Sequence, residues 1–218
     1  MRIFIGIDPR AAVAYNVLQW SIIRRASKPV QIVPLVLGQL PLTRKGLTHF
    51  TYSRYLAPWL CNYQGISVFM DSDMLVLGDV YELKEYADAA VSVVKGKERF
   101  EWPSMMVFNN EKCGELTPDF INDEGSQPQN FEWAEEVGEL PGEWNHCVGY
   151  DEPCDAKLVH FTMGIPHFPE CRLSEYADVW KEEYASMIGA SSWFELMGNS
   201  VHAKHVLSHL QQNMANFQ

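Results

Sequence analysis

Two aspartates, one residue apart, interrupt an apolar stretch of the chain and are the residues best suited to chemistry. Asp71 and Asp73 follow the apolar run of residues 66–70, and apolar residues resume directly after them as 74–77. In an extended segment, side chains two positions apart point to the same side, so both carboxylates can face one point while Ser72 turns away. Two such charges repel each other and lose hydration, and a divalent cation reverses this cost. The pattern therefore predicts a cation site for Mg²⁺ or Mn²⁺, the ions that suit oxygen ligands.

A histidine late in the chain is the next candidate ligand. His160 closes the apolar run of residues 158–160, and Gly164 and Pro166 fix a loop directly after it, where ligand-binding groups are common. An imidazole ligand would shift the preference of the site from Mg²⁺ towards Mn²⁺. The structural alternatives are a hydrogen-bonded histidine at a strand end, and carboxylates that cap a turn or face water.

The elements that must position these residues alternate between strand and helix. The sequence predicts strands near residues 3–7, 30–36, 66–70, 89–94, 104–110 and 156–164, and helices over 11–25, 52–65, around 131–138 and from about 173 onward. Strand, helix and strand within the first forty residues form a βαβ unit, which predicts an α/β fold with a mostly parallel central sheet flanked by helices. Ligands of such sheets bind outside the carboxyl ends of the strands, where Asp8, the aspartate pair and His160 all fall.

The composition narrows the possible partners and surroundings. The net charge is −11, from 17 lysines and arginines against 28 aspartates and glutamates, which argues against non-specific nucleic-acid binding. The five cysteines form no CxxC pair and are expected to be reduced thiols. No run of 18 apolar residues and no signal-peptide pattern occur in the sequence, so we expect no membrane span and a cytoplasmic location.

Four motifs, in this order along the chain, resemble those of the GT-A glycosyltransferases, especially the family-eight type that includes glycogenin and bacterial galactosyltransferases. Residues 3–10, IFIGIDPR, resemble the first strand of that family. Residues 51–60, TYSRYLAPWL, resemble its helix that carries a basic residue just before the DxD strand. Residues 69–83, FMDSDMLVLGDVYEL, are similar to the family's DxD strand and its continuation. Residues 160–164, HFTMG, are similar to its late histidine element. The resemblance extends from residue 3 to about residue 168.

The resemblance implies a GT-A, Rossmann-like catalytic domain over residues 1–218. Residues 1–90 would form a nucleotide-binding half, 91–170 an acceptor-side half, and 171–218 C-terminal helices. It further implies a metal-dependent transferase that moves a sugar from a nucleotide-diphosphate donor, with a UDP-sugar favoured, to an unknown sugar, lipid or protein acceptor, with retention of configuration. Asp71, Asp73 and His160 would bind the metal, and Asn145 would line the acceptor side. The implied donor-binding residues are Ile7, Asp8, Tyr15, Arg54, Asp71, Ser72, Ser104, Gly164 and His167.

Three positions depart from the family pattern. Ile165-Pro166-His167-Phe168 stands where the family has Lys-Pro-Trp, so His167 takes the place of a lysine that holds phosphate. Trp102-Pro103-Ser104-Met105 stands where the family has the Asn-Ala/Ser-Gly element that holds the donor sugar. The Asp-Gln pair near the reacting carbon has no counterpart, and Asn130 and Glu132 are the candidates that the corresponding region offers. The sequence therefore leaves the catalytic group unassigned.

Two other classes of function stay open. A sugar-nucleotide or metal-binding module without turnover would also keep the aspartate pair while lacking the lysine and the Asp-Gln pair. A haloacid-dehalogenase-type phosphatase also places a DxD motif after an apolar strand, but there the motif follows the first strand, and Thr or Val takes the position that Leu75 holds here. Activity on an aryl phosphate would indicate the phosphatase, and donor binding without transfer or donor hydrolysis would indicate the module.

Overall fold

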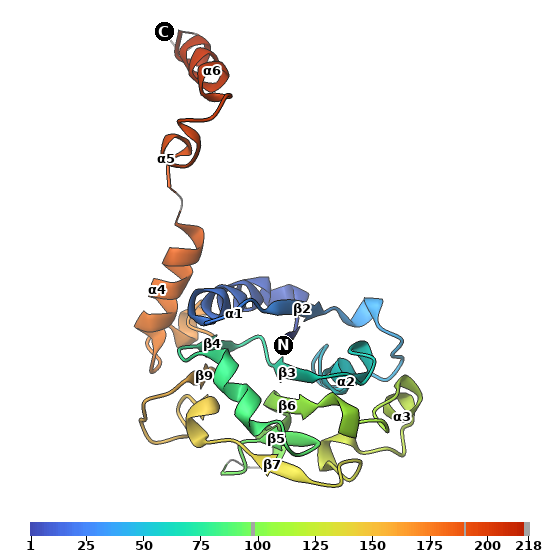
Figure 1. Cartoon of the computed structure of the whole chain (residues 1–218). Helices are drawn as coiled ribbons and strands as arrows, with labels where there is room; N and C mark the ends of the chain where they lie inside the picture. Colours follow the sequence, from blue (N-terminus) through green and yellow to red (C-terminus); the bar gives the residue numbers. More distant parts are fainter. Residues whose placement is uncertain (97–98, 190, 216–218) are drawn as a thin grey trace. The chain divides into compact units, whose positions relative to one another are not determined.

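The computed structural model describes residues 1–96, 99–189 and 191–215, and the chain folds into two compact units (Figure 1). The first unit comprises Met1–Tyr184 and holds every strand of the described residues. The described residues of the second unit, Ala185–Gln218, form helices joined by turns. The predicted division of the first 170 residues into a nucleotide-binding half and an acceptor-side half stays a prediction.

A six-stranded sheet forms the centre of the first unit. Its strands are β1 (Arg2–Gly6), β2 (Gln31–Leu35), β3 (Ile66–Met70), β5 (Val91–Val93), β6 (Met105–Asn109) and β7 (Val137–Glu139), in the order β2-β1-β3-β6-β5-β7. Strand β1 pairs in parallel with β2 and β3, and β5 pairs in parallel with β7. Only β6 of these strands runs the other way, antiparallel to both β3 and β5. The prediction of a mostly parallel central sheet is thus confirmed.

A smaller sheet stands beside the first and contains the late histidine strand. It comprises β4 (Met74–Val76), β8 (His146–Cys147) and β9 (Leu158–His160), in the order β4-β9-β8. Strand β9 is antiparallel to β4 and parallel to β8. The late strand predicted from the sequence therefore exists, but it pairs with the continuation of β3 rather than joining the central sheet.

The helices of the first unit are mostly short. The α-helices are α1 (Ala12–Arg25), α2 (Ala57–Leu60), α3 (Pro118–Asn122) and α4 (Ala177–Ile188), the last of which crosses the boundary between the units. The 3₁₀ helices are Pro9–Ala11, Leu37–Gln39, Ser53–Leu56, Val80–Tyr86, Arg99–Ser104, Asn110–Lys112, Pro128–Asn130, Gly142–Trp144 and Pro169–Cys171.

Alternation along the central strands divides the core into two parts. Ile3, Ile5 and Met70 point to one face of the sheet, where Leu18 and Ile22 of α1 cover them. Phe4, Phe69 and Phe108 point to the other face, against Leu56 and Trp133. Successive side chains of a strand point to opposite faces, so a strand that is buried on both faces reads as a continuous apolar run. This is why these strands could be located from the sequence.

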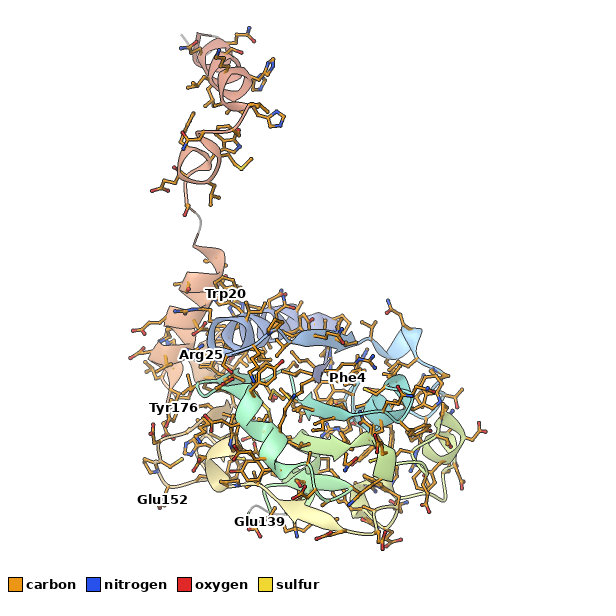
Figure 2. All side chains as sticks on the ribbon, viewed as in Figure 1. Phe4, Trp20, Arg25, Glu139, Glu152 and Tyr176 are labelled. Carbon is orange, nitrogen blue, oxygen red and sulfur yellow. The ribbon has the colours of Figure 1, made fainter. Side chains whose placement is uncertain are left out.

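Helices α1 and α4 are joined by a buried carboxylate. Glu183 of α4 is 2% exposed, and its two oxygens lie 3.1 Å from Arg24 Nη1 and 2.8 Å from Arg25 Nη2. Figure 2 labels Arg25 on α1. A buried carboxylate needs paired cations to offset its lost hydration, and two arginines supply them here.

Two predicted helices differ from the structure. The helix expected around residues 131–138 is wrong: a turn that starts at Phe131 leads instead into β7. Phe131 has a left-handed backbone with φ of 59°, and the Trp133 indole nitrogen donates to the carbonyl of Pro128 at 2.9 Å, which closes the turn. The helix expected over 52–65 ends at Leu60, because Asn62 and Tyr63 are left-handed.

The second unit contains two helices, α5 (Trp193–Met197) and α6 (Ala203–Ala215). Ser192 and Glu195 form a reciprocal capping box at the start of α5. Together with α4 they confirm the prediction of helices after residue 173. Across the described ranges, no helix has the length and apolar character that crossing a membrane requires.

Candidate metal centre

The structure brings the predicted aspartate pair and the late histidine together. Asp71 and Asp73 lie in the turn between β3 and β4, and His160 is the last residue of β9. The antiparallel pairing of β4 with β9 sets Met74 opposite His160 and so places the imidazole beside Asp73. One ligand atom from each of the three side chains lies within 4.8 Å of the others, and His160 Nε2 is 3.4 Å from Asp73 Oδ1. The carboxylates converge because of a turn, not because of the extended segment that the sequence predicted.

Two carboxylate oxygens in this group accept no hydrogen bond. They are Asp71 Oδ1 and Asp73 Oδ1, both inaccessible to water, although each lies within ion-pair distance of a cationic side chain. A buried carboxylate oxygen without a hydrogen bond costs free energy, and a bound cation would offset that cost. Two carboxylates and one imidazole also form a ligand set that suits Mn²⁺. The residues present therefore fit a divalent metal ion.

A chain of hydrogen bonds fixes the orientation of the His160 ring. Ser104 Oγ donates to the carbonyl of Glu101 at 2.5 Å, and therefore accepts from Asn145 Nδ2 at 3.0 Å. The Asn145 amide is thereby oriented so that its Oδ1 accepts from His160 Nδ1 at 3.0 Å. With Nδ1 held as the donor to Asn145, Nε2 faces the aspartates and can bind a metal ion once it gives up its own proton. A second shell of this kind sets the tautomer that a metal-binding histidine needs.

A second group of possible ligand atoms shares the same histidine. Glu101, Cys147 and His160 also bring one ligand atom each within 4.8 Å of the others. Glu101 Oε2 lies 3.7 Å, and Cys147 Sγ 3.9 Å, from His160 Nδ1. That nitrogen is already hydrogen-bonded to Asn145, whereas Nε2 faces the two orphaned aspartate oxygens. The aspartate side of the ring is therefore the better candidate for a metal.

Arg54 is the buried cation of the site. Its Nη2 lies 3.1 Å from Asp71 Oδ1, and its Nε donates to the carbonyl of Phe50 at 3.1 Å. The guanidinium also stacks on the rings of Phe50 and Phe69, at 5.5 and 5.0 Å from their centres. Arginine suits this position because its planar fork can stack on rings and bind an anion at the same time.

Burial and crowding shift the protonation of the group. Burial raises the pKa of Asp71 to about 7, and the neighbouring charges of Asp73 and Glu101 add to the rise, while Arg54 and His160 oppose it. Burial lowers the pKa of His160, but the Asp73 carboxylate beside it outweighs this, so the pKa of His160 is raised well above its usual value. Without a metal, the folded site therefore holds protons that the unfolded chain would release.

The melting temperature of the metal-free protein should fall as the pH rises from about 5 to about 8. The folded state binds more protons than the unfolded state here, because the pKa values of Asp71 and His160 are both raised, so stability is lost as each group deprotonates. Thermal unfolding in the presence of a chelator measures this. Asp71→Asn should flatten the pH dependence, and the exposed Asp88→Asn should not. Equal pH dependence in wild type and Asp71→Asn would contradict these electrostatics.

The residues predicted for the first strand lie at the same edge of the sheet as the aspartates. Ile5 pairs with Met70, so Ile7 and Asp8 continue past the end of β1 alongside the turn that holds Asp71. Asp8 caps the 3₁₀ helix after β1 and pairs with Arg10 at 2.6 Å, and the hydrogen bonds from Arg10 lower its pKa to about 2.

Of three further predicted residues, Tyr15 packs against the core, whereas Ser72 and Ser104 belong to the site or to its support. Tyr15 of α1 is half-buried against the core on the α1 side of the sheet. Ser72 is buried between the two aspartates. Ser104 belongs to the hydrogen-bond chain described above, and its carbonyl accepts from the backbone N–H of Asp71 at 2.9 Å. Ser104 and Asp71 are neighbours because Met105 pairs with Met70 in the central sheet.

The structure does not bring all the predicted residues into the group. His167 packs against the rings of Trp180 and Tyr184 of α4, with ring centres 6.3 and 6.2 Å apart. Gly164 shapes the loop between His160 and His167: its φ is 122°, and a Cβ there would lie 2.9 Å from Cys171 Sγ. The loop position of this glycine is thus structural, and contact with a donor stays a prediction.

The candidates for the catalytic group lie on the loop after α3. Asn130 ends a 3₁₀ helix, and Glu132 is exposed. This loop reaches the segment beside the site through Phe131, whose ring centre lies 6.0 Å from that of Trp102. Neither residue is part of the group formed by the aspartates and His160.

Sequence reasoning missed Glu101. Its carboxylate is one-fifth exposed, lies near His160 and raises the pKa of Asp71. The sequence held one local signal for Glu101: it lies three residues before Ser104, and the resemblance implies that Ser104 binds the donor.

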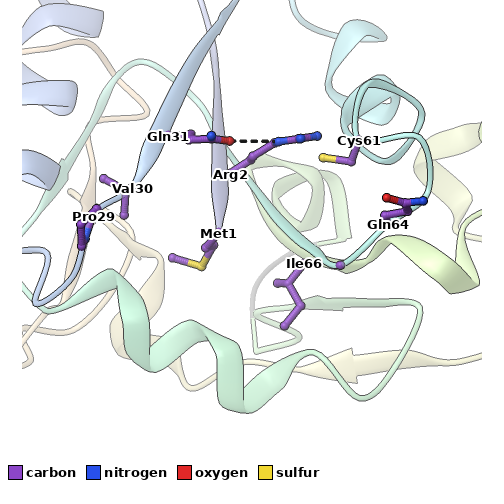
Figure 3. A pocket seen from close by; sticks show the side chains of 9 residues that line it. Met1, Arg2, Pro29, Val30, Gln31, Cys61, Gln64 and Ile66 are labelled. Atoms are coloured by element: carbon purple, nitrogen blue, oxygen red, sulfur yellow. Dashed lines mark hydrogen bonds between the residues drawn. The ribbon is translucent and has the colours of Figure 1, made fainter.

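A cavity of about 410 Å³ lies elsewhere on the first unit (Figure 3). Met1, Gln31 and Ile66 line it at the amino ends of the first three strands, where Arg2 Nε donates to Gln31 Oε1 at 3.1 Å. The aspartate pair follows the carboxyl end of β3, so this cavity is at the opposite edge of the sheet and does not belong to the candidate metal centre.

The central sheet, with β6 inserted against the direction of its neighbours, and the small sheet beside it give the chain the GT-A fold that solved glycosyltransferases share. The bifunctional glycosyltransferase WbbM superimposes with a TM-score of 0.65 at 19% identity, over 88% of this chain and 50% of that chain. The glycosyltransferase GlyE of Streptococcus pneumoniae TIGR4 superimposes with a TM-score of 0.62 at 16% identity, over 89% of this chain and 63% of that chain. The galactosyltransferase LgtC superimposes with a TM-score of 0.56 at 12% identity, over 89% of this chain and 99% of that chain. The chain thus spans half of WbbM and less than two thirds of GlyE.

One curated relative defines the family. The chain is 34% identical to Protein CDI of Arabidopsis thaliana over an alignment of 222 positions, and the alignment covers 84% of this chain and 85% of the relative. The chain therefore belongs to the family of Protein CDI. No protein-family model matches it.

Proposed function

We propose that this chain is a metal-dependent glycosyltransferase that moves a sugar from a nucleotide-diphosphate donor to an acceptor. One observation carries the proposal. In a GT-A fold, at the carboxyl edge of the central sheet, two buried aspartate oxygens without hydrogen bonds share a site with His160, whose Nε2 lies 3.4 Å from one of them. The solved neighbours support the reaction class, since their names describe glycosyltransferases, one of them solved with donor and acceptor sugar analogues.

The chain's own residues account for donor binding. Asp71, Asp73 and His160 would hold a divalent ion, with Mn²⁺ favoured, which when bound neutralises the donor diphosphate and the charge that develops as the nucleotide leaves. Arg54 supplies a second, fixed positive charge beside Asp71. Its guanidinium is held by the Phe50 carbonyl and two rings, so little reorganisation is needed when the phosphate charge grows. Asn145 and Ser104 keep the His160 ring in the orientation that binding requires.

The finer assignments belong to the same proposal. The donor is a UDP-sugar, the acceptor is a sugar, lipid or protein, and the transfer proceeds with retention, as in the family-eight enzymes. Ile7, Asp8 and Tyr15 contact the nucleotide, and Ser72, Ser104, Gly164 and His167 the rest of the donor. Asn130 or Glu132 approaches the reacting carbon once substrates are bound. A cytoplasmic location completes this proposal.

A panel of nucleotide sugars tests this function. Each donor is incubated with the full chain, with Mn²⁺ or with a chelator, and released nucleotide diphosphate is measured with and without simple sugar acceptors. We expect metal-dependent release from one donor class. Binding of a donor, seen as a raised melting temperature, without any release would support a non-catalytic sugar-nucleotide module instead.

One observation favours that second candidate. His167 stands where the family has a phosphate-holding lysine, and its ring packs on Trp180 and Tyr184 of α4. If His167 stays there when the donor is bound, the phosphates have one cation fewer than in the family. His167→Lys should then raise donor affinity; an unchanged affinity would remove this argument for a module.

Asn145→Ala should weaken Mn²⁺ binding about 10–100-fold, the usual effect of losing a partner that orients a metal ligand. The change removes the acceptor for His160 Nδ1–H and frees the ring and its tautomer, while leaving every proposed ligand in place. Calorimetry with Mn²⁺ measures the affinity. Asn16→Ala, at an exposed position of α1, is the matched control. Equal affinity in Asn145→Ala and wild type would show that the hydrogen-bond chain does not serve a metal.

A further inference from the structure

A cysteine, a histidine and a glutamate form a second constellation on the far side of β8 from the metal centre. Cys154 Sγ lies 3.4 Å from His146 Nδ1, and the other ring nitrogen, Nε2, lies 3.3 Å from Glu175 Oε2. The thiol is exposed and the imidazole is buried, with 1% of its side chain accessible. The thiol and the carboxylate thus contact opposite edges of one ring.

This geometry suits proton transfer rather than metal binding. A carboxylate at Nε2 holds the proton on that nitrogen, so the Nδ1 lone pair is free to accept the proton of the thiol. A nucleophile, a base and a group that orients the base form the arrangement that activates cysteine for attack. Because the sulfur and the carboxylate contact opposite nitrogens, the three side chains do not converge on a single ion.

The surrounding structure holds the three side chains in place. Tyr176, directly after Glu175, has a left-handed backbone with φ of 57°. Its hydroxyl donates to the carbonyl of Cys154 at 2.8 Å, and its ring meets the His146 ring edge-on with centres 5.4 Å apart. Strained backbone that persists is held by its surroundings and is concentrated at functional sites. Figure 2 labels Tyr176 and also Glu152, which belongs to the loop that contains Cys154.

The thiol opens into an acidic surface cavity of about 300 Å³. Besides Cys154 and His146, its lining includes Glu143, Asp151, Glu152 and Asp155. These carboxylates oppose an anionic reactant, and they would also destabilise the oxyanion of an acyl-transfer intermediate. They admit a small neutral electrophile. The charge of the cavity therefore disfavours anionic reactants and acyl transfer, and favours attack of the thiol on a small neutral electrophile.

We propose that Cys154, His146 and Glu175 form a reactive-thiol site that is oxidised by a hydroperoxide. The sulfur attacks one peroxide oxygen, the S–O bond forms as the O–O bond breaks, and sulfur gives up the electron pair that the peroxide takes. His146 accepts the thiol proton and passes it to the departing alkoxide or hydroxide. The products are a cysteine sulfenic acid and an alcohol or water, so atoms and charge balance. The site is separate from sugar transfer and does not depend on it.

Trapping of the sulfenic acid tests the proposal. The full chain is treated with hydrogen peroxide in the presence of dimedone, and the rate of adduct formation at each cysteine is followed by mass spectrometry. We expect Cys154 to react about tenfold more slowly in His146→Gln and several-fold more slowly in Glu175→Gln. His205→Gln and the exposed Glu182→Gln are matched controls that should leave the rate unchanged. Equal Cys154 rates in wild type and in both site variants would overturn the proposal.

A second measurement keeps the test valid should the buried His146 be needed for folding. In the wild-type chain, the rate of Cys154 alkylation by neutral iodoacetamide is followed against pH, with the partly buried Cys171 as an internal reference. Contact with the imidazole favours the thiolate, while Glu175 and the four cavity carboxylates oppose it; Tyr176 is uncharged, because burial and the neighbouring acidic groups raise its pKa. An inflection below the usual thiol value of about 8.5 supports activation, and one at or above that value overturns it.

Discussion

Asp73→Asn is expected to lower kcat/KM for metal-dependent sugar transfer by about 10²–10³-fold, since a metal's charge stabilisation is worth several kcal/mol. The change removes the negative charge from an oxygen that accepts no hydrogen bond, next to His160, so it acts on the ion and not on the packing. One third of the Asp73 side chain is exposed and asparagine has the same shape, so the fold should be kept, with the melting temperature lowered only by loss of the ion pair with His160. Nucleotide release at a series of Mn²⁺ concentrations measures the effect.

The control for this variant is Asp88→Asn, which makes the same substitution at an exposed aspartate and should keep full activity. Activity of Asp73→Asn equal to that of wild type, with the same requirement for Mn²⁺, would remove Asp73 from the metal shell. A loss of activity accompanied by a large drop in melting temperature would instead assign the aspartate a structural role.

Arg54→Ala should have the second largest effect, on stability and on donor binding together. Asp71 would lose its ion-pair partner at 3.1 Å inside the protein, and removing one partner of a buried pair costs about 3 kcal/mol or more. Because burial already raises the pKa of Asp71 to about 7, protonation limits this cost near and below neutral pH. Chemical denaturation at pH 6 and pH 8 should therefore show a larger loss at the higher pH.

Donor affinity should fall in the same variant by about 10–100-fold, the range for a hydrogen bond to a charged group. Arg54→Lys keeps the charge but loses the stacked, planar fork, so it should recover stability better than donor affinity. The exposed Arg172→Ala is the control for the loss of an arginine. A normal donor affinity in Arg54→Ala would show that Arg54 serves Asp71 alone.

Local sequence patterns located the strands because burial on both faces makes a strand apolar throughout. The run that forms β3 and the two carboxylates that end it carry this signal without any knowledge of the rest of the chain. The sequence predicted extended backbone after β3, and the structure has a turn there. The two carboxylates converge all the same, because their spacing and burial constrain them in a turn as in an extended segment.

The support of the site could not be read in the same way. The hydrogen-bond chain from Glu101 to His160 depends on the antiparallel pairing of β6 with β3 and on the small sheet, and both join residues far apart in sequence. Local patterns do not encode such pairings. The false helix around residues 131–138 has a related cause: Phe131 and Trp133 pack on each other and on the core in a turn, which long-range packing decides.

Strand β8 separates the two sites that the first unit presents. Asn145 and Cys147 face His160, whereas His146 between them faces Cys154 and Glu175. Alternation along an extended segment thus lets three consecutive residues serve two different chemistries. The sequence singled out Asn145 through resemblance, but the thiol site needed the structure, because its three members come from separate segments.

The most direct test of the central claim is a crystal of the full chain soaked with Mn²⁺ and UDP, with anomalous diffraction recorded at the manganese edge. The account predicts one strong anomalous peak about 2.2 Å from an oxygen of Asp71 or Asp73 and from Nε2 of His160, with the UDP phosphates on its open side. Bound UDP with no manganese peak at these three side chains, or a peak elsewhere on the molecule alone, would contradict it.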